Sequence, residues 1–201
     1  VVQYENTHAP LYGYRNKIEY SVVGTGDGLS LAFFSRGTHM KRPIPECILA
    51  TPAINATTQT ILSWLKKFSF PARSVKSIIV RSNAAGETLA GIFLKDKVTL
   101  HELPPLSNSC HGIQFFYSDP RCPASRDDLK LAEVGSQILT ESVLGKELLY
   151  GLLSFFQVRV PAFECALRDI AKFIEPGDTV IDFYAGVGAI SIPLADRITK
   201  A

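Results

Sequence analysis

Residues 177–195 read Gly-Asp-Thr-Val-Ile-Asp-Phe-Tyr-Ala-Gly-Val-Gly-Ala-Ile-Ser-Ile-Pro-Leu-Ala. The apolar pair Val180 and Ile181 predicts a buried strand. Gly186 and Gly188 predict a turn where the backbone can bend and approach a ligand, and the residues behind them predict the first turns of a helix. This order opens a doubly wound α/β domain. Such a domain cannot form its buried sheet from a single strand. We therefore expect the rest of the domain to come from a longer protein or from a partner.

The position of the acidic residue favours one class of cofactor. Asp182 comes before the glycines, whereas a dinucleotide fold keeps its acid about 20 residues downstream. A carboxylate at the strand end would repel a pyrophosphate, but it suits a ligand that carries an ammonium and a sulfonium. The segment therefore favours S-adenosylmethionine over NAD. An ordinary glycine turn between a strand and a helix is the alternative.

A second segment lies just upstream. Residues 148–158 are almost entirely apolar and end in Phe-Phe-Gln-Val, and Pro161 then opens a helix. The helix is predicted to stop at Glu175-Pro176-Gly177. Its apolar residues follow helical spacing at Phe163, Ala166, Leu167, Ile170, Ala171 and Ile174.

Together these segments resemble the RNA uracil-5-methyltransferases, the S-adenosylmethionine enzymes that make 5-methyluridine in ribosomal and transfer RNA. The resemblance continues near the other end, in Tyr14-Arg15-Asn16-Lys17 and in the run from Phe33 to His39 that leads to Cys47. Ala32 and Thr38 stand where the family has glycine and serine. Residues 54–123 match only in their layout of a helix followed by strands.

The resemblance implies an α+β central domain at residues 1–148, followed at 149–201 by the beginning of an α/β Rossmann-like methyltransferase domain. It implies part of an enzyme of RNA methylation and rRNA processing, with 23S ribosomal RNA preferred to transfer RNA. The family attacks carbon 6 of a flipped uracil with a cysteine and removes the carbon 5 proton with a carboxylate. Both groups are expected beyond Ala201. We therefore expect this chain alone to be inactive and to need the missing C-terminal part of the methyltransferase domain.

The resemblance also assigns cofactor-binding residues. The family's glutamine in the Phe-x-Gln-Val run contacts the cofactor, which implies this role for Gln157. An aromatic residue at the position of Tyr184 lies against the cofactor. Asp182 would orient its methionine end, and Gly186 and Gly188 would let it approach the backbone. Arg159 stands where the family commonly has asparagine.

Basic residues next to aromatic rings predict RNA contacts, because cations bind phosphates and rings stack on unpaired bases. The expected RNA-binding residues are Arg15, Lys17, Arg36 and His39. The alternative is that they are the solvated ends of a hairpin whose aromatic residues belong to the core.

Composition sets the class of protein. The chain has 201 residues, of which 46% are hydrophobic and 20% charged, as expected for one full domain and part of another. No apolar stretch is long enough to span a membrane, and residues 1–10 do not resemble a signal peptide, so with the resemblance we expect a cytoplasmic protein. The net charge of +2 is too small to indicate nucleic-acid binding. No metal site or iron–sulfur cluster is expected, and reduced, buried thiols are predicted at Cys47, Cys110, Cys122 and Cys165.

The rest of the chain predicts a helix over a sheet. A glycine-rich turn joins two strands, a proline-marked loop at 43–45 follows, and a hairpin leads to the C-terminal part. The expected strands are Ile18–Val23, Leu29–Phe34, Val75–Arg81, Thr88–Leu94, Ile113–Tyr117, Val134–Leu139 and Lys146–Leu153, with a helix at Ile54–Phe68.

Two other functions remain open. A non-catalytic RNA-binding module would use the central domain alone, and a nicotinamide-binding oxidoreductase fragment would use the glycine turn for a dinucleotide.

Overall fold

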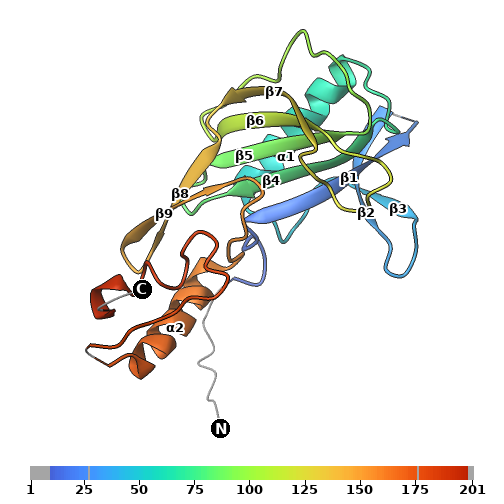
Figure 1. The fold of residues 1–201 in the computed structure, drawn as a ribbon. Helices are drawn as coiled ribbons and strands as arrows, with labels where there is room; N and C mark the ends of the chain where they lie inside the picture. The colour runs from blue at the N-terminus through green and yellow to red at the C-terminus, as the bar shows by residue number, and fades with distance from the viewer. Residues whose placement is uncertain (1–9, 27, 176, 199–201) are drawn as a thin grey trace.

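The computed structural model describes residues 10–26, 28–175 and 177–198. Its main feature is a seven-stranded mixed sheet in the order β3-β2-β1-β4-β5-β6-β7, drawn in Figure 1. Among these strands β5 and β6 pair in parallel, and the other neighbours pair antiparallel. The bounds are β1 (Lys17–Thr25), β2 (Gly28–Phe34), β3 (Lys41–Ile44), β4 (Val75–Ser82), β5 (Thr88–Leu94), β6 (Cys110–Tyr117) and β7 (Leu129–Gly135).

Two predicted strand pairs are confirmed. The strands β1 and β2 form an antiparallel hairpin that extends further into the glycine-rich segment than expected, as far as the pair Thr25 and Gly28. The strands β4 and β5 pair from Ser82 and Thr88 to Val75 and Leu94. In both cases a short turn forces consecutive strands to be neighbours, so local sequence is sufficient to predict the pairing.

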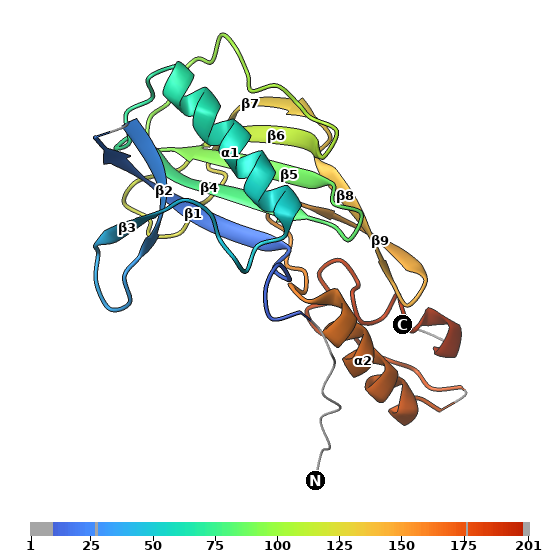
Figure 2. The same cartoon turned by 180° about the vertical axis from the view of Figure 1, so that it is seen from behind.

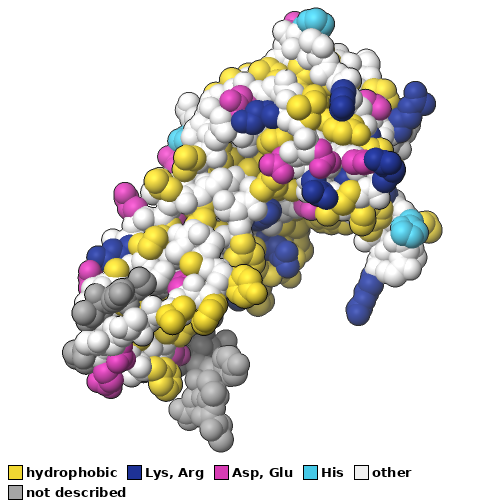
Figure 3. All heavy atoms as spheres, in the orientation of Figure 1, with side chains coloured by type: hydrophobic (Ala, Val, Ile, Leu, Met, Phe, Trp, Pro, Cys, Tyr) yellow, Lys and Arg dark blue, Asp and Glu magenta, His cyan; other side chains and the backbone are white. Residues whose placement is uncertain are grey.

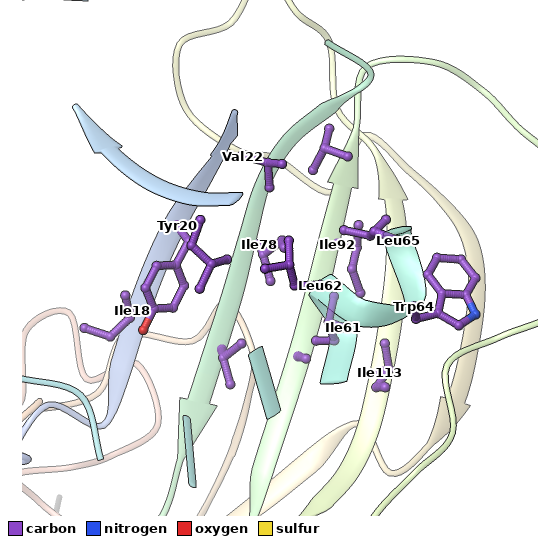
Figure 4. Close-up of a cluster of buried hydrophobic side chains, with 14 of the residues drawn as sticks. Ile18, Tyr20, Val22, Ile61, Leu62, Trp64, Leu65, Ile78, Ile92 and Ile113 are labelled. Carbon is purple, nitrogen blue, oxygen red and sulfur yellow. The ribbon is translucent and has the colours of Figure 1, made fainter. Parts of the chain in front are cut away.

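Helix α1 (Pro52–Lys67) covers one face of the sheet, as Figure 2 shows from behind. It begins where Thr51 caps it, since the Thr51 side chain accepts from the Ile54 N–H, and Pro52 occupies the first turn. Figure 4 shows the helix residues Ile61, Leu62 and Leu65 against the sheet residues Ile78 and Ile92. Fully burying each such side chain stabilises the fold by about 1.5–3 kcal/mol. The predicted helix over a sheet is confirmed.

The opposite face is partly covered by a second hairpin, β8 (Ile138–Val143) with β9 (Lys146–Gly151). The predicted strand Val134–Leu139 is wrong, because Val134 belongs to β7 and pairs with Ile113, and a new strand starts only at Ile138. The break lies at Gly135, whose φ is 78° and where a Cβ atom would meet the His111 carbonyl oxygen. Residues 134–139 therefore contain a turn that requires glycine at position 135.

The proline-marked segment at residues 43–45 is not simply a loop. Lys41–Ile44 forms β3, in which Pro43 pairs with Ala32 of β2. A proline lacks the N–H that a central strand needs, but an edge strand has one side without a partner and tolerates it. The strand lies at the edge of the sheet in the strand order.

The C-terminal region contains α2 (Val160–Ile170) and two short 3₁₀ helices, η1 (Ala171–Phe173) and η2 (Ala195–Arg197). The predicted helix start at Pro161 is confirmed, and Leu167 and Ala171 pack into the cluster beneath β8 and β9. The expected buried strand at Val180 and Ile181 is not formed, and turns replace the expected α-helix after Gly188.

The reason is that a strand exists only through hydrogen bonds to a neighbouring strand. All described strands belong to the two sheets above, and none of them pairs with Val180 or Ile181. Large apolar side chains of this segment consequently face solvent, with Ile181 72%, Phe183 79% and Tyr184 102% exposed. The expected start of a Rossmann-like sheet stays a proposal.

Candidate functional site

The segment that carries Gln157 is held by the N-terminal Tyr14–Lys17 run. The Asn16 side-chain amide donates to the Gln157 carbonyl oxygen at 2.9 Å. Next to it, the Arg159 guanidinium carbon lies 4.9 Å from the centre of the Tyr14 ring, and Arg159 Nη2 donates to the Pro10 carbonyl at 3.1 Å. Residues 141 positions apart in the sequence thus meet, and they fix the main chain at Gln157.

A second connection comes from a buried arginine in β4. Arg81 is 1% exposed, its Nη1 atom donates to the Gly151 carbonyl at 2.9 Å, and its guanidinium carbon lies 5.1 Å from the Tyr150 ring centre. Burial lowers the pKa of Arg81 from its ordinary value. Tyr150 stacks on Phe156 with ring centres 4.4 Å apart. These contacts connect the central sheet to the residue that directly precedes Gln157.

The glycine turn is present, and Asp182 spans it. Gly186 and Gly188 have φ values of 58° and 72°, which L-residues rarely adopt. A Cβ atom at Gly188 would lie 2.5 Å from Ile192 Cδ1. Asp182 Oδ2 accepts from the Ser191 N–H at 3.3 Å, so a half-buried carboxylate is oriented across the turn. This arrangement can attract a cation while leaving backbone groups accessible.

The structure does not bring all predicted cofactor residues together. In residues 10–26, 28–175 and 177–198, no hydrogen bond, ion pair or ring contact joins Gln157 to Asp182, Tyr184, Gly186 or Gly188. Tyr184 is fully exposed and has a positive φ of 61°. Its predicted place against a cofactor therefore stays a prediction.

The predicted RNA-binding residues form two groups. Arg36 and His39 are exposed in the loop between β2 and β3, whereas Arg15 and Lys17 lie at the start of β1. Arg15 is exposed, but Lys17 is half-buried opposite Arg81, and burial and then Arg81 lower its pKa. Lys17 is therefore less available to a phosphate than Arg36.

Two positioning residues, Asn16 and Arg81, were not predicted. The Tyr14–Lys17 run was interpreted through its cations, yet Asn16 is its most buried member, at 8% exposed. Asn16 directly precedes β1, and no pattern in this short run indicates that its amide is buried. Nothing in the local sequence of Arg81 indicates its bond to Gly151, because the two residues are 70 positions apart.

The cysteines and the helices were also subjects of prediction. All four cysteines are free thiols; Cys47 and Cys110 are buried, whereas Cys122 and Cys165 are partly exposed. The prediction of reduced thiols is confirmed, and the prediction that all are buried is wrong for two of them. Within the described ranges, the helices are too short or too polar to cross a bilayer.

Comparisons with known proteins find similarity between this chain and RNA methyltransferases. No family model matches the chain. It is 22% identical over 204 residues to the uncharacterized RNA methyltransferase YljE of Lactococcus lactis, covering 93% of this chain and 44% of that protein. It is 26% identical over 227 residues to the tRNA (uracil-5-)-methyltransferase homolog A of Mus musculus, covering 93% of this chain and 36% of that protein. The chain thus spans less than half the length of these relatives.

A solved structure shows the fold. The tRNA (uracil-54, C5)-methyltransferase of Pyrococcus abyssi, crystallised with S-adenosyl-L-homocysteine, matches with a TM-score of 0.71 and 19% identity. The match covers 94% of this chain and 48% of that chain. This chain therefore has the fold of the matching part of that protein.

Proposed function

We propose that the chain is part of an S-adenosylmethionine-dependent RNA uracil-5-methyltransferase. The observation that carries the proposal is the open glycine turn at Gly186 and Gly188 with the oriented carboxylate of Asp182 before it. The names of the relatives and the fold of the Pyrococcus abyssi enzyme support it. The proposed division is a central domain at residues 1–148 and the start of a methyltransferase domain at 149–201, joined through β9.

The residues fit a cationic methyl donor. Asp182 offers a negative charge, and a Cβ atom at Gly186 would meet nothing closer than 3.8 Å, so a ligand can approach its backbone. When bound, the cofactor supplies an electrophilic methyl group on a sulfonium. Asp182 would hold its ammonium end, and the bond from Asn16 would keep Gln157 in place to contact it.

We also propose that the catalytic nucleophile and base come from polypeptide outside this chain. Cys47 and Cys110 lie in the core between α1 and the sheet, and burial raises the pKa of the Cys110 thiol, which makes it a poor nucleophile. The exposed apolar residues Ile181 and Phe183 are consistent with further strands that complete the sheet.

RNA is the proposed substrate, contacted through Arg15, Lys17, Arg36 and His39. Ribosomal RNA stays our prediction from the Tyr14–Lys17 and Phe155–Val158 runs. The mouse relative and the Pyrococcus abyssi structure are named for tRNA, so both RNAs belong in the test.

The test of the cofactor is a calorimetric titration of the chain with S-adenosylhomocysteine and, separately, with NAD. We expect tighter binding of S-adenosylhomocysteine, and we expect Asp182→Asn to weaken it about tenfold, because a charge-assisted hydrogen bond is lost. Asp178→Asn is the matched control, since the exposed Asp178 carboxylate accepts from the Glu175 N–H rather than from the glycine turn. Tighter binding of NAD would replace the proposal with the oxidoreductase alternative.

A second assay separates the enzyme from a non-catalytic RNA-binding module. Radiolabelled S-adenosylmethionine is incubated with ribosomal and transfer RNA transcripts and either the chain or its full-length protein. We expect transfer by the full-length protein only, and Gln157→Ala in that protein should reduce cofactor affinity more than RNA affinity. RNA binding without any methyl transfer would support the module.

A further inference from the structure

A cavity of about 500 Å³ opens on the sheet face opposite α1, and none of the sites above uses it. Its floor is β1 and β4, where Glu19, Ser21 and Ser77 alternate with the core-facing residues. The hairpin of β2 and β3 forms one wall, and the loop at residues 120–125 forms the other. Figure 3 looks at this face and shows dark-blue and magenta side chains among yellow ones.

The charges in the cavity are predominantly positive. Three lysines line it, against the single carboxylate of Glu19. Lys76 is occupied, because its ammonium donates to Ser118 Oγ and to the Asp119 and Ala124 carbonyls and so anchors the loop wall. Lys41 and Lys95 form no ion pair within the part of the chain that the structure describes. Because Lys41 and Lys95 form no ion pair and the lysines outnumber the one carboxylate of the lining, the cavity favours an anionic ligand.

The Lys41 ammonium supports this interpretation by its environment. It donates to the Val22 carbonyl at 2.9 Å, which leaves two of its three protons for other acceptors. Burial, and then repulsion from Lys95, lower the pKa of Lys41. An anion between the two lysines would relieve this repulsion.

An exposed aromatic ring completes the cavity. Phe34 is 56% exposed, and Lys41 Nζ lies 5.6 Å from its ring centre. An aromatic surface next to paired cations is the combination that binds single-stranded nucleic acid, in which bases stack on rings and phosphates bind cations. An acidic peptide would use the lysines but leave the ring unused.

The cavity lies close to the segment that carries Gln157. Asn16, which holds Gln157, directly precedes β1, and Glu19 on the cavity floor is three residues further along the chain, or about 10 Å at 3.3 Å per residue. The cavity also shares the sheet face on which Ile79 and Phe93 contact the β8–β9 hairpin. An RNA strand that reaches Gln157 could therefore continue into it.

We propose that this cavity binds single-stranded RNA next to the modified uridine, with phosphates at Lys41 and Lys95 and a base stacked on Phe34. The inference rests on the proposed function and adds a subsite to it. It differs from the predicted RNA residues Arg36 and His39, which lie on the neighbouring loop.

The test measures binding of a fluorescent uridine-rich RNA of about 12 nucleotides, a length within the range of single-strand sites, by anisotropy over a series of salt concentrations. In the double variant Lys41→Gln/Lys95→Gln we expect the slope of log affinity against log salt to fall by about 1.4, or about 0.7 for each lost phosphate contact. Phe34→Ala should weaken binding at least about fivefold through lost stacking, with little change in the slope. Lys95→Arg should keep the slope of the parent.

The matched control is Lys66→Gln/Lys67→Gln, which removes the same charge from α1 on the other side of the sheet. Circular dichroism verifies the fold of every variant, and Phe34→Ala provides an independent readout should Lys41→Gln unfold. If the parent binds RNA and the two double variants have equal slopes, the proposed RNA subsite in the cavity is overturned while the proposed function stands. No RNA binding by the parent would overturn the proposed function as well. Displacement of RNA by polyglutamate at equal charge would replace RNA with an acidic protein segment.

Discussion

The sheet covered by α1 and the C-terminal segment 177–198 are both rich in apolar residues, yet large apolar side chains are buried in the sheet and exposed in the segment. In the first region Ile61, Leu65 and Ile92 are 0% exposed, whereas in the second Ile181 and Phe183 are 72% and 79% exposed. The difference lies in neighbours, since each strand of the sheet has a partner and α1 covers its face (Figures 1 and 2). Apolar sequence therefore becomes a buried strand only where a hydrogen-bonding edge is available.

The largest expected effect is a difference in stability between one substitution in each of these two regions. Leu65→Ala should lower the free energy of unfolding by about 2–5 kcal/mol, because it leaves a cavity in a packed core. Ile181→Ala should change it by less than about 0.5 kcal/mol, because that side chain already faces solvent. Urea denaturation of both variants measures the contrast. A comparable cost for Ile181→Ala would show that the segment is packed in solution.

The next effect concerns the connection between the central sheet and β9. Arg81→Met should lower the free energy of unfolding by about 1–2 kcal/mol, because the Gly151 carbonyl loses its donor in a buried site. Arg42→Met is the control, since Arg42 is exposed and its side chain donates to Ser35 Oγ, an exposed contact. Urea denaturation measures both variants. Unchanged stability of Arg81→Met would mean that the cost of burying the cation cancels its hydrogen bond.

A smaller and more local effect is expected at Asn16. Asn16→Ala should cost about 1 kcal/mol and accelerate amide hydrogen exchange around residues 157–159, because the Gln157 carbonyl is no longer held. Gln59→Ala removes the same kind of bond, to the Pro45 carbonyl, far from this segment. Equal exchange at residues 157–159 in both variants would remove Asn16 as a positioning residue.

The smallest effect is a dependence on pH. Burial raises the pKa of Glu141, so the folded protein binds this proton more tightly than the unfolded chain does. The free energy of unfolding should therefore fall as pH rises from the ordinary glutamate pKa through the raised one. Over that interval Glu141→Gln should become more stable relative to the parent. The hydrogen bond from Lys130 lowers the pKa of Glu133. Glu133→Gln should therefore become less stable relative to the parent as pH rises. Thermal melts over a pH series measure both differences in stability. A change in the same direction for both variants would contradict the opposite pKa shifts of Glu141 and Glu133.

Much of the central fold was predictable because its contacts are local in the sequence. The β1–β2 and β4–β5 pairs follow from short turns, and α1 follows from apolar spacing and the cap at Thr51. The failures share a cause, since Gly135 and Pro43 act through their position in the sheet. Gly135 is needed where a Cβ atom would meet a carbonyl of the neighbouring strand, and Pro43 is tolerated because β3 is an edge.

The candidate site was predictable in its chemistry but not in its construction. The order of Asp182 and the two glycines is visible in the sequence, and the structure orients that carboxylate across the turn. The roles of Asn16 and Arg81 depend on contacts with residues 141 and 70 positions away, for which no local pattern exists.

The sequence by itself determined the β1–β2 and β4–β5 pairs, the two helices and the glycine turn, because periodicity, caps and backbone preferences act between residues a few positions apart. The tertiary structure alone decided which apolar segments are buried, where Gln157 is held and how Lys41, Lys95 and Phe34 come to share one cavity. These outcomes depend on which strands become neighbours, and that is settled by the packing of the whole sheet.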